Sequence, residues 1–500
     1  MNQGTTEMRG ISRGKLWAGC GTADISPGAD YFEQRRRGAD ESGRYGGFRP
    51  NAFCEGVAEP IFARTLVTRA GDQALVLMTA DLSTIQTDVS AVVRSEVARR
   101  HGLPGACITI ACSHNHSAPP LAADTPYARQ VISALVASAG TAFEALEPAR
   151  IGATTGYCPS IAYNERLPLT KETPREFYPH PRHLGGVKFS RDHLEARTGG
   201  RPTDPQVGVI RLDRADGTPL GLVVDFAAHA ATEIEPERVS GDYVGFALAK
   251  IARSLPRCCA LFCQGAAAGM NINHIFGTLD DARRSGEALA EEVLRVVDDA
   301  RTTDRVEIGW QQQVFPLEFD PLPPREELED EVRVYREFLN ELARDPGACW
   351  FGDGRKTINL PPKYPAVARQ RMVLPLIEYN ERALAGNAPP NEPLRLELQT
   401  FRWNEIVLAL NPMELFVQTG LEIKRLSPFR HTYPVCYANA CCGYVPPPEE
   451  VALGGYNVVT AYKYSRRPGP VAATNAHRAV RQFVKMLQET VAEGSAEGGE

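Results

Sequence analysis

The sequence has no long run of apolar residues, and this excludes a membrane-spanning helix. No stretch of the 500 residues reaches the roughly twenty apolar residues that such a helix needs. The first nine residues are polar and no apolar segment follows them, so we expect no signal peptide and a cytoplasmic protein. The formal net charge is only −6. Nothing in this charge favours nucleic acid as a partner.

Several cysteine and glycine signatures are also missing. The twelve cysteines show no C-x-x-C spacing, which argues against thiolate zinc fingers. Cys258–Cys259 and Cys441–Cys442 are adjacent pairs, and adjacent cysteines rarely bond to each other because the ring is strained. We therefore expect reduced, mostly buried thiols. Gly265 and Gly269 are not followed by the Lys-Ser/Thr of a phosphate loop, and Gly19-x-Gly21 lacks the third glycine of a dinucleotide fingerprint.

Strand and helix patterns alternate irregularly along the chain, with hairpins between them. This order predicts an α/β (mixed α+β) fold of stacked mixed β-sheets flanked by helices, in one large domain spanning 1–500. Residues 28–50 are rich in Gly, Arg and Asp, and we expect a loop there. A long surface excursion or lid is expected at about 158–205, and a frayed tail from about 493. The expected strands are 16–27, 61–70, 73–80, 106–112, 206–212, 220–226, 259–264 and two within 394–410, and the expected helices are 88–101, 125–146, 243–255, 282–300, 326–344, 366–385 and 475–492.

The strongest chemical signal is Ser113-His114-Asn115-His116, which follows directly after an apolar strand. Residues two apart in an extended chain point the same way, so both imidazoles project from one strand end. Neutral imidazole is a good zinc ligand, and this spacing is typical of a metal pair. The alternative is a pair of surface or turn histidines.

Other candidates are weaker when each is taken alone. His229 follows a second apolar strand, where a lone histidine is more often a structural residue with satisfied hydrogen bonds. Glu414 lies in an apolar setting and needs a partner, either a metal or an arginine. Ser240 or Asp242 is expected to cap the helix that follows. Tyrosines on turns, such as those at 444 and 456, are commonly packing residues.

Together these motifs resemble the neutral (non-lysosomal) ceramidase family, in its N-terminal catalytic domain. The ordered resemblance runs from Ala23-Asp24-Ile25-Ser26-Pro27 to Tyr456. It includes the segments Cys112–Pro119, Phe226–His229 with Ser240, Asn164–Arg166 with one residue inserted, Pro412–Glu414, and the tyrosines Tyr444 and Tyr456.

The resemblance implies one zinc ion per chain. Its ligands would be His114, His229, Glu414 and Tyr444. The resemblance also places His116, Arg166 and Tyr456 beside the metal, as groups that act on the substrate.

Three departures from the family change the expected substrate. Asn271 stands where the family has the serine that takes part in amide cleavage, and an amide cannot form an alkoxide. The family's C-terminal immunoglobulin-like domain and a signal peptide are also not expected in this chain. We therefore expect a cytoplasmic relative that acts on a substrate smaller and more polar than ceramide.

The resulting hypothesis is a zinc-dependent hydrolase in which metal-bound water attacks an N-acyl amide bond. His116 would shuttle a proton, Arg166 and Tyr456 would stabilise the oxyanion, and Asn271 would orient substrate or water. Asn164 and Gln264 are the candidate substrate-binding residues. Asp81 and Asp242 are candidates to support the histidines.

Two other functions stay open at this point. A metal-dependent glycosidase or other sugar-processing enzyme would suit the basic 158–205 segment and the loss of the serine. A family member that binds metal or ligand without turnover is the other alternative. The expected partner is a small molecule, and the sequence leaves a homo-oligomer open. The basic segment contains Arg166, Lys171, Arg175, Arg182, His183 and Lys188.

Overall fold

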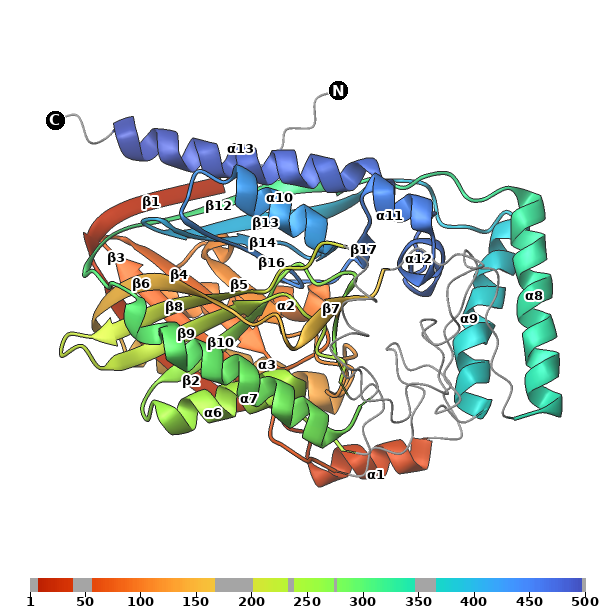
Figure 1. Ribbon diagram of the computed structural model, residues 1–500, viewed down its shortest axis with the longest axis horizontal. Helices are drawn as coiled ribbons and strands as arrows, with labels where there is room; N and C mark the ends of the chain where they lie inside the picture. Colours follow the sequence, from red (N-terminus) through yellow and green to blue (C-terminus); the bar gives the residue numbers. More distant parts are fainter. Residues whose placement is uncertain are drawn as a thin grey trace.

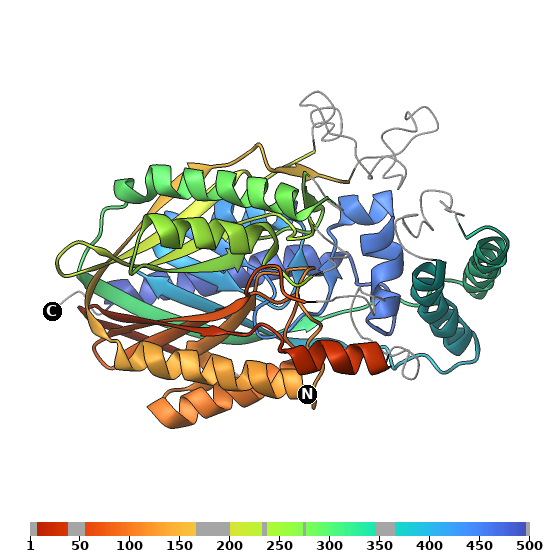
Figure 2. The same cartoon turned by 90° about the horizontal axis from the view of Figure 1, so that it is seen from below.

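The computed structural model describes residues 8–38, 56–166, 201–232, 238–273, 277–346 and 366–496 (Figure 1). Two β-sheets lie face to face, and helices cover the outer face of each (Figures 1 and 2). The order of layers is therefore helix, sheet, sheet, helix. This arrangement lets each sheet bury one face against the other sheet and one face under helices.

The larger sheet has eight strands in the order β10-β9-β8-β6-β2-β3-β4-β5. Only the pairs β4–β5 and β9–β10 are parallel within it. The strands are β2 (Trp17–Asp24), β3 (Phe62–Ala70), β4 (Gln73–Ala80), β5 (Ile108–Cys112), β6 (Glu147–Tyr157), β8 (Gln206–Arg214), β9 (Pro219–Phe226) and β10 (Cys259–Gln264).

The smaller sheet has five strands in the order β1-β12-β13-β14-β16. The pair β14–β16 is parallel and the other pairs are antiparallel. Its strands are β1 (Met8–Lys15), β12 (Arg305–Leu317), β13 (Leu394–Trp403), β14 (Ile406–Leu410) and β16 (His431–Val435). Two short pairs lie outside the main sheets: β7 (Ala162–Asn164) with β11 (Met270–Ile272), and β15 (Glu414–Leu415) with β17 (Tyr444–Val445).

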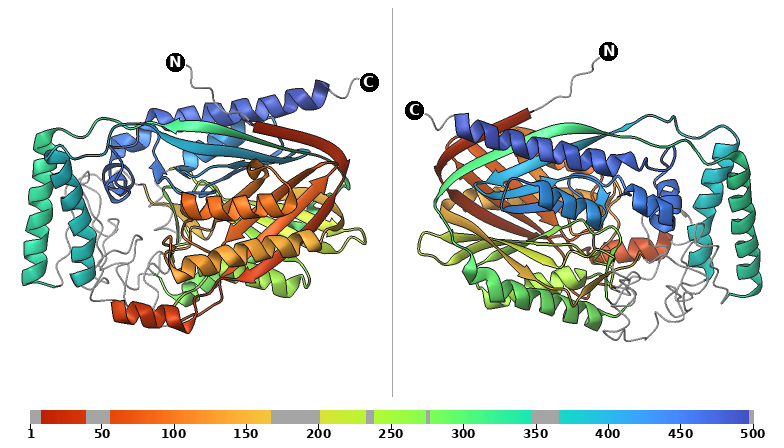
Figure 3. Two further views of the ribbon diagram at one scale, coloured as in Figure 1. Left: turned by 180° about the vertical axis from the view of Figure 1, so that it is seen from behind. Right: turned by 45° about the horizontal axis from the view of Figure 1, so that its top comes forward.

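Helices cover both outer faces, as the two views of Figure 3 also show. On the larger sheet these are α2 (Thr87–His101), α3 (Pro126–Glu144), α6 (Asp242–Ser254) and α7 (Leu279–Val296). On the smaller sheet they are α10 (Val417–Leu426) and α13 (Thr474–Ala496). A separate pair, α8 (Arg325–Arg344) and α9 (Ala366–Leu384), packs together at one end of the molecule (Figure 1). The short helical elements are α1 (Ala29–Gly38), a 3-10 turn (Gly105–Cys107), a second one (Val297–Asp299), α11 (Pro448–Leu453), a π-helix (Tyr456–Thr460) and α12 (Ala461–Tyr464).

The core between the sheets is apolar. Leu66, Leu77 and Val223 of the larger sheet belong to one buried cluster with Phe401 and Leu408 of the smaller sheet. Burying side chains of this size stabilises the fold by roughly 1.5–3 kcal/mol each. This rigid platform positions the strand ends that carry the site. Within the described residues, no helix combines the length and the apolarity required to cross a bilayer.

The expected fold of stacked mixed sheets flanked by helices is confirmed, but several local expectations were wrong or incomplete. Residues 29–38 form helix α1 inside the stretch expected to be a loop, because a run of good helix formers outweighs the flanking glycines. Strands β1, β6, β12 and β16 were missed, as were the short strands β7, β11, β15 and β17. The glutamines at 311 and 313 made β12 look polar, although both are buried in the sheet. Helix α13 continues to Ala496, beyond the expected end at 492. Most of the basic excursion, 167–200, lies outside the described residues.

Candidate metal centre

Loops that follow the carboxyl ends of four strands meet at one place. The loop after β5 carries His114 and His116, and the loop after β9 carries His229. The loop after β14 carries Glu414, and the segment after β16 leads to Tyr444. Two backbone hydrogen bonds tie these loops together: the Cys112 amide donates to the Tyr437 carbonyl (3.2 Å), and the Cys436 amide donates to the Gln264 carbonyl (2.9 Å). Strand ends of this kind are where sites in α/β proteins usually lie.

Three imidazoles converge at this junction. One ring nitrogen from each of His114, His116 and His229 lies within 4.8 Å of the others. The Nε2 atoms of His114 and His116 are 3.3 Å apart. Nitrogen ligands at ordinary zinc distances lie about 3.3 Å from each other in a tetrahedral site. The cluster therefore has dimensions that fit a metal ion.

Glu414 completes the cluster on its buried side. Its Oε2 atom lies 3.7 Å from Nε2 of His114 and 3.8 Å from Nε2 of His229. These distances are too long for hydrogen bonds. The His229 Nε2 atom is buried and has no hydrogen-bond partner among the described residues. A buried polar atom without a partner is costly, and a shared cation between carboxylate and imidazole would satisfy it. Within the described residues, Glu414 lies beside His114 and His229 and forms no ion pair with the arginine that was its alternative partner.

Backbone carbonyls orient the two buried imidazoles. The Nδ1 atom of His114 lies 3.0 Å from the Ser83 carbonyl, and that of His229 lies 3.0 Å from the Ala267 carbonyl. Such contacts fix Nδ1 as the protonated nitrogen and turn Nε2 toward a metal. The Tyr437 ring stacks on His114 at a centroid distance of 4.0 Å, and its hydroxyl donates to Glu414 (3.3 Å).

The two aspartates expected to support the histidines have other partners. The Asp81 carboxylate accepts hydrogen bonds from the Arg64 guanidinium at 2.8 and 3.0 Å. The Asp242 carboxylate accepts one from the Tyr243 amide at 2.6 Å. The Ser240 hydroxyl accepts one from the Asp242 amide at 3.2 Å. The N-cap residue of α6 is Gly241 and no side chain caps the helix, so the expected cap by Ser240 or Asp242 was wrong.

Four of the eight non-glycine residues with positive φ in the described part of the chain lie in the loops around the cluster. His114 (φ 55°), Asp242 (φ 51°), Tyr437 (φ 56°) and Asn439 (φ 61°) all adopt left-handed conformations. Each such residue costs free energy and persists only when its surroundings hold it in place. Asn439 is held by hydrogen bonds in both directions, since its backbone amide donates to the Ile110 carbonyl (2.8 Å) and its side-chain oxygen accepts from the Ile110 amide (2.9 Å). This concentration is typical of a functional site.

The charge states of the cluster suit a cation. Burial lowers the pKa of His114 to about 4, so this imidazole is neutral at pH 7. Burial alone would raise the pKa of Glu414, but His229 and His114 reverse this effect and hold it below its ordinary value. A neutral imidazole and an ionised carboxylate are the forms that bind metal.

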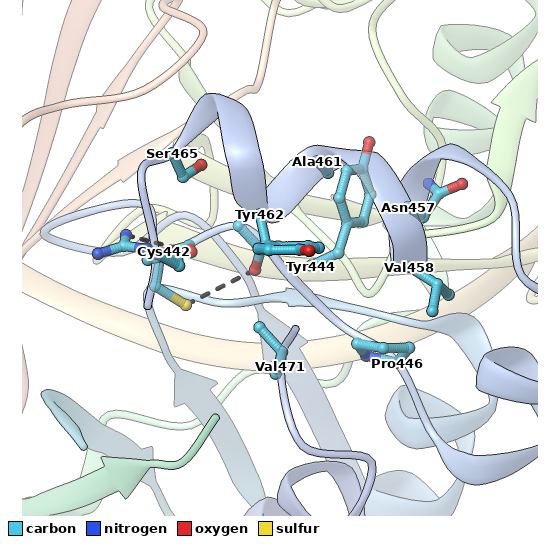
Figure 4. Close-up of a pocket in the computed structure, with 11 residues that line it drawn as sticks. Cys442, Tyr444, Pro446, Asn457, Val458, Ala461, Tyr462, Ser465 and Val471 are labelled. Carbon is cyan, nitrogen blue, oxygen red and sulfur yellow. Dashed lines mark hydrogen bonds between the residues drawn. The ribbon is translucent and has the colours of Figure 1, made fainter. Parts of the chain in front are cut away.

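Tyr444 is brought to the cluster by strand pairing. Strands β15 and β17 run parallel with Glu414 opposite Tyr444, so the two side chains start from neighbouring positions. The Tyr444 ring lies 6.5 Å from the His229 ring and 6.0 Å from the Tyr456 ring, centroid to centroid. Figure 4 shows the small cavity beside Tyr444, lined by the 442–446 segment and by helical residues that include Asn457 and Tyr462. Its volume of about 10 Å³ admits about one water molecule.

Arg166 is held by a carboxylate that the sequence did not single out. Its Nε atom donates to the Glu450 carboxylate at 2.9 Å, and its Nη2 atom donates to the Gly454 carbonyl at 2.7 Å. The Nη1 atom lies 3.4 Å from the Asn457 side-chain oxygen. The guanidinium is therefore fixed beside the loop that leads to Tyr456.

The three side-chain amides that were expected to contact the substrate differ in their hydrogen-bond partners. Both amide groups of Asn164 bind backbone: Nδ2 donates to the Pro202 carbonyl (2.7 Å), and Oδ1 accepts from the Arg166 amide (2.9 Å). Gln264 is fully buried, and its Oε1 atom has no partner among the described residues. Asn271 pairs with the His229 backbone as an isolated bridge and donates a hydrogen bond to the Glu165 carboxylate.

Sequence reasoning missed four residues that shape the site. Tyr437 and Cys441 contact Glu414, Glu450 holds Arg166, and Glu165 contacts Asn271. Of these, Glu165 alone carried a signal, as the residue inserted in the Asn164–Arg166 motif. The others follow segments with no distinctive local pattern.

A buried carboxyl group on β9 provides a test of the packing beneath the site. Burial raises the pKa of Asp225 to about 7, with Lys424 opposing and Asp204 adding to the effect. A raised carboxyl pKa means that stability is greatest below the unfolded pKa near 4 and falls as pH rises toward 7. We expect Asp225→Asn to raise the free energy of unfolding by about 2 kcal/mol or more at pH 8, and by much less at pH 4.5. Urea unfolding at both pH values measures this. An equal effect at the two pH values would contradict the assignment, and Asp298→Asn on the surface is the control.

Comparison with known proteins identifies the fold. The chain matches the crystal structure of neutral ceramidase from Pseudomonas aeruginosa with a TM-score of 0.64 and 20% sequence identity, over 95% of this chain and 74% of that chain. A ceramidase complexed with C2 matches with a TM-score of 0.64 and 18% identity, over 95% and 75% of the two chains. No protein-family model and no curated protein sequence matches the chain. The similarity to neutral ceramidases expected from the sequence motifs is thus confirmed as a similarity of fold.

Proposed function

We propose that this protein is a zinc-dependent hydrolase that cleaves an amide bond of N-acyl type in a small, polar substrate. The observation that carries the proposal is the convergence of three imidazoles and the Glu414 carboxylate around the unpartnered Nε2 atom of His229. Imidazole and carboxylate donors in this number are the usual zinc set. Zinc held there would supply a Lewis acid and a water molecule that ionises near neutral pH.

The proposed ligands are His114, His229, Glu414 and Tyr444, with His116 beside them. His116 is half-buried, and its backbone amide donates to the Ala230 carbonyl at 2.8 Å. His116 is thus the most exposed of the three histidines, and we assign it the role of carrying a proton between the cluster and solvent. Arg166 and Tyr456 stabilise the developing oxyanion, and Asn271 orients the substrate. Arg166 suits this role because Glu450 fixes its guanidinium in advance.

The compartment and the substrate follow from different features. None of the ten cysteines in the described part of the chain forms a disulfide, which supports a reducing cytoplasmic environment. A polar amide is preferred to ceramide because Asn271 stands at the place of the family serine, so a water molecule must be the nucleophile. A metal-dependent glycosidase is the alternative, and the substrate screen below separates the two.

The first experiment measures metal content by mass spectrometry in the purified protein. We expect about one zinc per chain in the wild type, and loss of this zinc in His229→Ala and in Glu414→Ala. His477→Ala, at an exposed position on α13, is the matched control and should retain the metal. Absence of stoichiometric metal in the wild type, even after zinc is offered, would overturn the proposal.

The second step offers the zinc-loaded protein 4-nitroacetanilide and 4-nitrophenyl glycosides. We expect release of 4-nitroaniline from the anilide. Cleavage of the glycosides alone would replace the amide proposal by the glycosidase.

A further inference from the structure

Glu165 lies on a fixed piece of backbone and contacts Asn271, whose backbone bridges to His229. Its own amide donates to the Gly269 carbonyl at 2.9 Å, and the next amide, that of Arg166, donates to the Asn164 side chain at 2.9 Å. Its side chain is exposed to solvent. The carboxylate is therefore both accessible and held close to one position.

The contact between Glu165 and Asn271 links this carboxylate to the cluster. The Asn271 Nδ2 group donates a hydrogen bond to Glu165 Oε2, while the Asn271 backbone bridges to His229. Asn271 is itself 5% exposed, so the hydrogen bond is made by a buried, well-positioned amide. Asn271 stands where the family resemblance places a serine, and its side-chain amide holds the Glu165 carboxylate by a hydrogen bond.

The charge of Glu165 affects the pKa of two proposed metal ligands, His229 and Tyr444. Burial lowers the pKa of His229, but Glu414 and, with a smaller effect, Glu165 reverse this and raise it. Burial, Glu414, Tyr456 and Glu165 all raise the pKa of Tyr444. Both effects agree with the hydrogen bond from Asn271 to Glu165, because the Asn271 backbone bridges to His229.

No cation in the described part of the chain forms an ion pair with Glu165. Its neighbour Arg166 turns away to the Glu450 carboxylate, at 2.9 Å. Glu165 is thus an accessible carboxyl group that forms no ion pair within the described residues.

The proposed function requires such a group. A water nucleophile must lose a proton as it attacks the carbonyl carbon, and the departing amine must gain one. The Nε2 atom of His116 lies 3.3 Å from that of His114, within the metal cluster. In the proposed function His116 exchanges protons with solvent, so the attacking water needs a separate group that takes its proton and returns it to the amine.

We propose that Glu165, positioned by Asn271, is the general base and acid of the reaction. This inference rests on the proposed hydrolysis. The oxygen of water forms a bond to the carbonyl carbon while one water proton passes to the Glu165 carboxylate. The C–N bond then breaks, the amine nitrogen takes the proton from the Glu165 carboxyl group, and the carboxylate is restored.

Two probes with the same acetyl group test this assignment. 4-Nitroacetanilide has an amine leaving group that needs a proton, whereas 4-nitrophenyl acetate releases a stable phenolate that does not. We expect Glu165→Gln to lower kcat/KM on the anilide by about 10²–10⁴-fold. The loss on the ester is expected to be at least about tenfold smaller, because only the base function is used. Glu165→Asp should recover part of the activity on the anilide.

Two further measurements separate this role from a structural one. Glu165→Gln should retain about one metal per chain, because Glu165 is not among the proposed ligands. In the cobalt-loaded protein, the pH-dependent change in the visible spectrum should move to lower pH in Glu165→Gln, since a nearby negative charge is removed. Glu449→Gln is the matched control, as an exposed glutamate on α11 near the site.

The outcomes distinguish the inference from the function beneath it. Equal losses on the two probes, or a spectrum that does not move, would overturn the role of Glu165 and leave the hydrolase intact. A zinc-loaded wild type that hydrolyses neither probe would overturn the proposed hydrolysis, and the role of Glu165 with it.

Discussion

Replacing Glu450 by alanine is expected to lower the free energy of unfolding by about 3–5 kcal/mol, because it leaves buried cations without their partner. The Glu450 carboxylate has no exposed surface. It accepts hydrogen bonds from Arg166, Arg201 and Gln418, and the Arg166 side chain is itself 9% exposed. Such a network is costly to break from one side.

The same substitution should also reduce turnover without removing the metal. Glu450 fixes the Arg166 guanidinium, and its backbone carbonyl accepts a further hydrogen bond from Arg166 at 3.1 Å. A misplaced oxyanion donor costs about 10²–10³-fold in kcat. Chemical denaturation, kinetics on 4-nitroacetanilide and metal content are to be measured together.

Two variants locate the effect of Glu450. Glu450→Gln keeps the shape and some hydrogen bonds while losing the charge, so its loss of stability should be intermediate. In a double-mutant cycle, Arg166→Ala and Glu450→Ala should be strongly non-additive, because the residues are in contact. Additive effects would contradict the coupling and leave Arg166 without a fixed position.

The sequence predicted the centre best where its residues follow apolar strands. His114 and His229 each come directly after a buried strand, and the carboxyl ends of such strands meet in space. Glu414 and Tyr444 carry no such local signal, since each lies in a strand of two residues that forms only through their pairing. The order of motifs suggested them, and the sheet pairing explains why they are adjacent.

Residues that act through distant contacts could not be predicted in this way. Arg166 and Glu450 are 284 positions apart, and no sequence pattern around either residue indicates that the two are in contact. Strand β12 was missed because Gln311 and Gln313 are polar, although the sheet buries both side chains. Tyr437 follows β16, a strand that was not predicted, and its left-handed backbone is imposed by the surrounding loops.

The second large effect is expected in the helices that flank Tyr456. Lys463 of α12 and Glu331 of α8 form an ion pair in which neither side chain has exposed surface. Asn380 of α9 donates a hydrogen bond to the same Glu331 oxygen at 2.7 Å. This polar group joins the α8–α9 pair to the helix that follows the π-helix of Tyr456. We expect Lys463→Met to lower the free energy of unfolding by about 3–5 kcal/mol, because Glu331 remains buried without its cation.

Replacing both Lys463 and Glu331 by apolar residues tests whether the loss of stability comes from the unpaired charge or from lost packing. The double variant Lys463→Met with Glu331→Leu should recover most of the lost stability, since both desolvated charges are removed. Arg336→Ala is the matched control, because its ion pair with Glu381 joins α8 to α9 at an exposed position. That control should cost no more than about 1 kcal/mol. A double variant as unstable as Lys463→Met would contradict the argument from unpaired charge.

The Lys463–Glu331 pair also bears on function, because the helices that it joins pack beside the Tyr456 ring. The Tyr464 hydroxyl donates to the Met372 carbonyl of α9 at 2.9 Å, and the Tyr464 ring lies 6.3 Å from the Tyr456 ring. If the helix pair positions Tyr456 for the oxyanion, the charge-free double variant will keep its zinc and its stability while kcat falls. If kcat stays at the wild-type value in that variant, Tyr456 takes its position from the π-helix alone, and the α8–α9 pair serves only the stability of this end of the molecule.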